Sequence, residues 1–205
     1  MKTLIALLLM TTLIPACGTK VLIPPRVDLR EHEILGIVDF ECNARGELAG
    51  LATRKFLEAA RAEQGIVRIV ELGPESELLK AVQADRLDPD AVRKIGEKYQ
   101  VNTLVTGTLT VSDVRPSIVL DPGASFGSFS ADVDAELSAR MLEVSTGASL
   151  WGNSAALTQK VAQISVFGGK NFSFDAKDPE KAYGKLVNDL VQRVTRDFRS
   201  TWEYR

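Results

Sequence analysis

A strand–helix–strand pattern near the start of the chain constrains its fold more than any other feature. Residues 34–40, ILGIVDF, form an apolar run of strand length that is rich in branched side chains, which indicates a buried strand. Residues 47–62 then place apolar residues at helical spacing, Gly65 ends that segment, and residues 66–70, IVRIV, indicate a second strand. This order is typical of a sheet with helices packed on it. The pattern therefore predicts an α/β fold.

Later segments extend the same layout. Two short helices are predicted over 74–82 and 88–100, the second with a capping aspartate followed by proline, and a third strand over 101–111. Residues 178–202 begin with Asp-Pro-Glu and carry an apolar residue at every fourth position. This spacing predicts a C-terminal helix of about 25 residues with a broad apolar stripe.

The middle of the chain changes from helical spacing to strict alternation. Residues 130–144 alternate apolar and polar side chains, which predicts a half-buried antiparallel strand with one wet face. A Ser-Thr-Gly turn at 145–147 then leads into a hairpin partner over 148–158. Residues 115–128 contain two prolines and two glycines, which predicts a loop or the tip of a long hairpin. Residues 159–175 fit neither period.

Together these segments predict a single α/β domain over residues 33–205. We expect a mixed β-sheet of about five strands in a two-layer or three-layer arrangement, with packed helices and a long C-terminal helix. The chain is long enough to bury one real core.

The N-terminus has the pattern of an export signal. Lys2 precedes an apolar run over 4–10, which is shorter than the roughly 20 residues of a membrane-spanning helix. The segment ends at Ala16-Cys17 and looks like a bacterial lipoprotein signal, in which residues 1–16 are removed and Cys17 is lipidated. The alternative is an ordinary signal peptide that ends at a cysteine by coincidence. Because Gly18-Thr19 contains no aspartate, resemblance to known sorting favours the periplasmic face of the outer membrane.

Residues 17–32 then predict a lipidated tether, since they include Pro24-Pro25 and show no sustained period. The net charge of −2 makes nucleic acid an unlikely partner, because phosphate binding needs a basic surface. The same weak charge leaves membrane attachment to the lipid on Cys17. The second cysteine, Cys42, has no partner for a disulfide and is predicted to be a buried structural thiol, with a reactive thiol as the alternative.

Residues suited to catalysis are sparse. His32 is the sole histidine and lies in the predicted tether, where we expect a solvated side chain. One histidine cannot supply a multi-histidine metal site, and no phosphate-binding glycine loop follows the first strand. The carboxylates that remain are Asp39, at the end of the first strand, and a set on one strand face: Asp132, Asp134 and Glu136. They could perform acid–base work or hold a cation, or they could simply face water. We expect no enzyme activity, no cofactor and no metal.

A stretch near the end of the ambiguous segment is a candidate partner contact. Phe167, Phe172 and Phe174 surround the pair Gly168-Gly169. These rings either fold back onto the core or form an exposed loop that meets a partner, because exposed aromatic patches usually mark contacts.

Three segments carry a resemblance to a known group. Residues 34–40, 90–107 and 139–147, the last followed by Trp151, resemble the opening strand, the helix-then-strand segment and the hairpin of one periplasmic α/β domain. That domain is shared by the TolB amino-terminal domain, LpoB and CsgG, and the likeness covers about residues 33–158. The resemblance implies an envelope protein that binds other proteins, with no catalytic residues to carry over.

The expected function is therefore that of a lipid-anchored periplasmic accessory protein that recruits or regulates a cell-envelope complex. The alternative is a subunit of an oligomeric curli-type secretion channel, whose members need two long membrane hairpins. Residues 113–133 and 154–175 are the places for such hairpins, and their sequences leave loop and hairpin both open. An enzyme using Asp39 or the 132–136 face is a third hypothesis. A homo-oligomer could form through a sheet edge or through the segment around Phe167.

Overall fold

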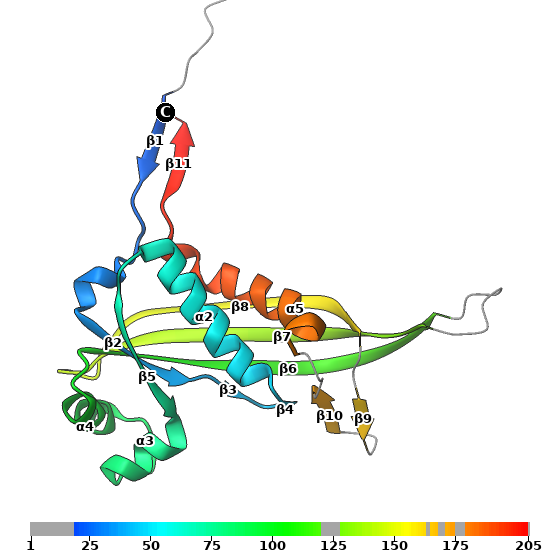
Figure 1. Cartoon of the computed structure of the whole chain (residues 1–205), viewed down its shortest axis with the longest axis horizontal. Coiled ribbons are helices and arrows are strands. Elements are labelled where there is room, and N and C mark those ends of the chain that lie inside the picture. The colour runs from blue at the N-terminus through cyan, green and yellow to red at the C-terminus, as the bar shows by residue number, and fades with distance from the viewer. Residues whose placement is uncertain (1–18, 120–127, 163–164, 168–170, 175–178, 205) are drawn as a thin grey trace, which may run out of the picture.

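Long-range strand pairing builds one mixed sheet, in which the predicted strands take part (Figure 1). The computed structural model describes residues 19–119, 128–162, 165–167, 171–174 and 179–204. The strand order is β5-β2-β6-β7-β8, and β3 also pairs with β6. β5, β2 and β6 run parallel to one another, β7 pairs antiparallel with β6, and β8 pairs antiparallel with β7. The strand bounds are β2 (Ile34–Asp39), β3 (Glu41–Cys42), β5 (Arg68–Pro74), β6 (Thr103–Val119), β7 (Ser128–Glu143) and β8 (Ser149–Ala162).

Helices cover both faces of this sheet (Figure 1). α2 (Leu48–Gln64) and α5 (Pro179–Val194) pack on one face, and α3 (Glu75–Val82) and α4 (Pro89–Tyr99) lie on the other. Alternation along β2 supplies both cores, because Ile37 belongs to the α2–α5 cluster and Val38 to the α3–α4 cluster. A strand buried on both faces needs the continuous apolar run that the sequence shows. The predicted single α/β domain is confirmed.

The C-terminal helix is shorter than predicted. α5 ends at Val194 and is followed by a 3-10 turn, η3 (Thr195–Phe198), and by strand β11 (Thr201–Tyr204). The prediction of a helix to residue 202 is therefore wrong. Residues 201–204 leave the helical path because their backbone pairs with β1 (Lys20–Ile23), a partner that no local spacing reveals.

The segment predicted as a tether carries structure of its own. It contains β1 and a 3-10 turn, η2 (Leu29–His32), whose first residue is 2 % exposed. Gln64 at the end of α2 holds this segment, since its Oε1 accepts from the Leu29 N–H at 3.1 Å and its Nε2 donates to the Val27 carbonyl at 3.0 Å. These contacts join residues far apart in sequence, so they left no periodic signal.

The alternating strand is confirmed. Val133, Leu137 and Met141 of β7 are fully buried, while Glu136 and Arg140 between them are exposed. β6 and β7 continue their pairing as far as Val119 and Ser128, so the hairpin interpretation of residues 115–128 is right for the described part.

The segment 159–175 completes β8 and adds two short strands. β9 (Ser165–Phe167) pairs antiparallel with β10 (Asn171–Phe174), and β10 pairs parallel with β4 (Arg45–Gly46). Phe167, Phe172 and Phe174 therefore lie in strands, and residues 168–170 between them are outside the described part of the chain. Their role as a partner contact stays a prediction.

One glycine marks a close approach between α4 and the sheet. A Cβ at Gly96 would lie 2.9 Å from Val144 Cβ and would overlap the methyl groups of the same side chain. Gly96→Ala is therefore expected to lower the free energy of unfolding by about 1–3 kcal/mol through overpacking.

Gly50 in α2 is the matched control, because a Cβ there would have only Arg54 Nη1 nearby, at 3.5 Å. Gly50→Ala should stabilise the protein by about 0.5–1 kcal/mol, since glycine weakens a helix interior. Urea unfolding of both variants tests the pair, and a stabilising Gly96→Ala would contradict the predicted overlap.

Candidate functional site

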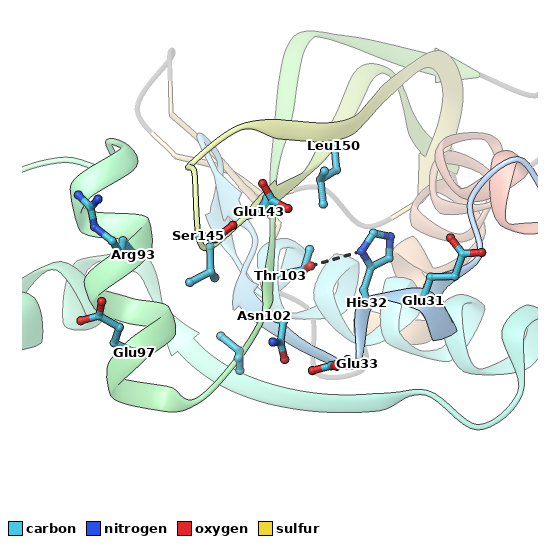
Figure 2. A pocket seen from close by; sticks show the side chains of 12 residues that line it. Glu31, His32, Glu33, Arg93, Glu97, Asn102, Thr103, Glu143, Ser145 and Leu150 are labelled. Carbon is cyan, nitrogen blue, oxygen red and sulfur yellow. Dashed lines mark hydrogen bonds between the residues drawn. The ribbon is translucent and has the colours of Figure 1, made fainter.

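A hollow of about 490 Å³ lies where η2, α4, the start of β6 and the β7–β8 turn meet (Figure 2). Arg93 and Glu97 come from α4, on the side of the hollow opposite Glu31 and Glu33. Its lining residues are Glu31, His32, Glu33, Arg93, Glu97, Val101, Asn102, Thr103, Glu143, Val144, Ser145 and Leu150.

The charged residues that line this hollow are mainly acidic. Four glutamates line it against one arginine, and that arginine forms an ion pair with Asp90 on its own helix. Glu143 accepts a hydrogen bond from Thr146 Oγ1 at 2.6 Å, which holds it at the β7–β8 turn. Within the described ranges, no group of three or more histidine, cysteine or acidic side chains could hold a metal ion. The glutamates are spread around an open rim.

His32 lies at the edge of the same hollow and is partly buried. Its Nδ1 is 3.4 Å from Thr103 Oγ1, the contact drawn as a dashed line in Figure 2. A hydroxyl and an imidazole at this separation resemble a nucleophile and its base. Thr103, however, is 2 % exposed, so its hydroxyl is closed off from a substrate. The contact ties η2 to the start of β6.

The carboxylates predicted as candidates lie on two strands. Asp39 ends β2, and β6 separates that strand from β7, which carries Asp132, Asp134 and Glu136. The register places Lys160 opposite Asp132 and Thr158 opposite Asp134.

Thr158 Oγ1 donates a hydrogen bond to Asp134 Oδ1 across this strand pair. Opposite charges and hydroxyls paired across strands stabilise the wet face of a sheet. This arrangement favours the structural interpretation for Asp132 and Asp134, whereas Glu136 lies opposite Ala156.

A second hollow, of about 370 Å³, lies on the sheet face beside the start of α3. Burial raises the pKa of Glu75 there, the nearby Glu41 carboxylate raises it further, and Arg140 opposes both. Thr106, Thr108 and Ser138 add hydroxyls to its wall. Sequence reasoning missed this cluster, because Glu75 looked like an ordinary acidic residue in the first turn of a helix. A carboxyl that keeps its proton more readily than usual can donate a hydrogen bond to a ligand.

The raised pKa of Glu75 predicts a pH effect on stability. The folded state binds its proton more tightly than the unfolded chain, whose carboxyl titrates near 4.5, so stability falls as pH rises from there through the folded pKa. Glu75→Gln removes this loss and should melt above the wild type at pH 7, with the difference shrinking below pH 4.5. Melting curves across pH test this, with the exposed Glu77→Gln as control. A difference that does not change with pH would contradict it.

Of the two cysteines, Cys42 lies within the described part of the chain. Cys42 is half-buried, the Ala44 N–H donates to its Sγ at 3.4 Å, and burial raises the pKa of its thiol. A raised pKa lowers the thiolate fraction, which favours the structural interpretation over a reactive thiol. Cys17 lies outside the described residues. Among the described helices, none is both long enough and apolar enough to cross a membrane.

Comparisons with known proteins place this chain beside several solved structures. The PelC dodecamer from Paraburkholderia phytofirmans has 14 % sequence identity and a TM-score of 0.43, covering 89 % of this chain and 97 % of that chain. The LpoB C-terminal domain from Salmonella enterica has 14 % identity and a TM-score of 0.40, covering 78 % and 96 %. A lipoprotein from Neisseria meningitidis has 16 % identity and a TM-score of 0.38, covering 62 % and 83 %.

No family model matches the sequence, and no curated protein matches it. At these identities and TM-scores, the likeness is limited to the course of the chain. The predicted resemblance to LpoB is found among these structures, and the resemblance to TolB and CsgG stays a prediction.

Proposed function

We propose that this chain is a non-enzymatic, lipid-anchored protein of the cell envelope that recruits or regulates an envelope complex through protein contacts. In this proposal lipidated Cys17 holds it at the periplasmic face of the outer membrane. The observation that carries the proposal is the β6–β7 arm, defined as residues 114–119 and 128–133.

The β6–β7 arm extends past the helices. Figure 1 shows β6 and β7 continuing beyond the ends of α2 and α5. At the base of the arm Val133 is still buried in the core, and beyond it the register pairs Pro116 with Ala131 and Ile118 with Phe129. The arm alternates these apolar pairs with polar ones such as Arg115–Asp132 and Ser117–Ser130. A strand pair outside the helical layers is marginal by itself and gains stability when another surface covers it. In the proposed function, a partner protein binds the β6–β7 arm and covers it.

The surroundings of His32 and of the β7 carboxylates favour a binding role over a catalytic one. The hydroxyl beside His32 is buried, and the carboxylates of β7 have the cross-strand arrangement of a wet sheet face. Contacts within the chain therefore account for these residues without a chemical step.

The length of the arm strands favours one second candidate, a subunit of an oligomeric secretion channel. β6 has 17 residues and β7 has 16, whereas strands usually have about five or six. Arms of this length could pair with those of neighbouring copies in a ring. This candidate and the accessory protein differ in what the arm contacts, either the same chain or other chains.

Shortening the arm tests the proposal. Replacing residues 116–131 by Asn-Gly joins Arg115 to Asp132, which the register already pairs, through a two-residue turn that suits a hairpin. The variant should fold and stay with the membrane, because the described cores lie outside the removed segment. After mild detergent extraction, the wild type should elute as a complex containing other chains and the shortened variant as a small species.

Site-specific photocrosslinking gives the matched control. A photoreactive residue at Ser117 in the arm should crosslink to another envelope protein in intact cells, and one at the exposed Lys94 on α4 should not. A ring of this chain alone would support the channel candidate instead. A wild type that elutes as a monomer, with equal crosslinking at both positions, would overturn both.

A further inference from the structure

The two ends of the chain form a ribbon that projects from the body (Figure 1). We call the antiparallel pair β1–β11 the terminal ribbon; its register joins Lys20 to Tyr204 and Leu22 to Trp202. Its large side chains are open to solvent, with Leu22 51 %, Trp202 63 % and Tyr204 70 % exposed. A two-stranded ribbon is marginal in water without packing, and this one leaves its largest apolar groups uncovered.

One face of the terminal ribbon gathers the aromatic residues. Residues two apart on a strand share a face, and directly paired residues share it as well. Lys20, Leu22, Trp202 and Tyr204 therefore form one face, and Lys20 Nζ lies 5.1 Å from the centre of the Tyr204 ring. The ribbon face thus combines an aliphatic residue, two amphipathic rings and a cation.

The short connection to Cys17 decides what can cover this face. Three Cα–Cα steps separate Cys17 from Lys20, so their Cα atoms lie at most about 11 Å apart. The polar layer of a bilayer is about 5–7 Å deep on each side of the hydrocarbon core. A lipid on Cys17 therefore holds the start of β1 within or directly above the headgroups, where tryptophan, tyrosine and lysine are enriched.

We propose that the terminal ribbon binds the headgroup region of the membrane, with Trp202 and Tyr204 as interfacial anchors. This proposal rests on the lipidation of Cys17 in the proposed function. The lipid and the ribbon then form a two-point attachment, which sets the orientation of the domain on the membrane. A lipid alone would let the domain rotate about a single link.

Tryptophan emission tests the proposal, because the chain has two tryptophans in contrasting places. Trp151 is 9 % exposed and its Nε1 donates to Asp197 Oδ2 at 3.2 Å, whereas Trp202 is open. The full-length protein, purified from membranes, is reconstituted into phosphatidylethanolamine–phosphatidylglycerol vesicles that carry bromine on the acyl chain near the headgroup. Bromine should quench the emission of the wild type. Trp202→Phe, which retains Trp151, should lose that quenching.

Flotation of the same vesicles separates the two proposals. Protein that floats, shows no bromine quenching and keeps a Trp202 emission that aqueous iodide quenches would overturn membrane binding by the ribbon and leave the anchor standing. Protein that does not float would overturn the lipid anchor, and the ribbon proposal with it. A dimer in the vesicles that Trp202→Phe dissociates, again without bromine quenching, would show that a second copy covers the ribbon.

Discussion

Replacing Phe198 by alanine is expected to lower the free energy of unfolding by about 3–5 kcal/mol. Phe198 is 1 % exposed, and its ring centre lies 4.9 Å from that of Trp151 and 5.9 Å from that of Phe56. Truncation would remove both aromatic contacts and leave a cavity between α2, β8 and the 3-10 turn η3. A domain of ordinary stability, about 5–15 kcal/mol, would lose a large share of it.

Urea unfolding measures this loss, with Phe198→Leu as the matched control. Leucine keeps most of the volume, so its cost should stay nearer the 1.5 kcal/mol typical of volume-conserving changes. Equal costs for alanine and leucine would contradict a role based on filling space. A cost below about 1 kcal/mol for alanine would show that the site collapses around the missing ring.

Replacing Gln64 by leucine is the second large change, expected to cost about 2–4 kcal/mol. The Gln64 amide is 6 % exposed; it accepts from the Leu29 N–H and donates to the carbonyls of Val27 and Phe198. Leucine fills the space but leaves these backbone groups without their partner. Each buried group left unsatisfied costs about 1–3 kcal/mol, and the added apolar side chain offsets part of the sum.

Two measurements separate this mechanism from a general loss of packing. The Leu29 amide should exchange its hydrogen with solvent much faster in Gln64→Leu, because its acceptor is gone. Ala62→Leu, at an exposed position in the same helical turn, should change neither stability nor exchange. Unchanged protection of the Leu29 amide in Gln64→Leu would contradict the hydrogen-bond account.

Gln64 also bears on the proposed attachment, because it binds the segments that lead into and out of the terminal ribbon. Val27 follows β1 and Phe198 precedes β11, and the Val27 N–H also donates to the Asp197 carbonyl at 3.1 Å. Figure 1 shows that the terminal ribbon and the β6–β7 arm leave the body in different directions. A ribbon fixed on the membrane would thus leave the arm accessible to a neighbouring protein.

Much of the fold could be predicted, because many of its elements have a recognisable pattern in their own residues. The apolar run of β2, the alternation of β7 and the cap of α4 each depend on residues within one element. In α4, Asp88 accepts from the Ala91 N–H at 2.9 Å, as a capping aspartate before proline should. The predicted sheet with packed helices followed from such signals.

The candidate sites were harder to predict, because their members come together only through the sheet. Glu75 begins α3 and Arg140 lies on β7, and their shared hollow depends on how α3 rests against the strands. The partial burial of His32 depends likewise on its contact with Thr103 on another element. The residue spacing within a single segment does not indicate such contacts between elements.

The sequence by itself determined the order of the main strands and helices and the wet and buried faces of β7. Only the tertiary structure decided where α5 stops, that β1 pairs with β11, and that Gln64 joins the two ends of the chain. The reason is physical: helical and strand periods arise from neighbours along the chain, whereas strand pairing and buried amides satisfy backbone groups over long sequence distances.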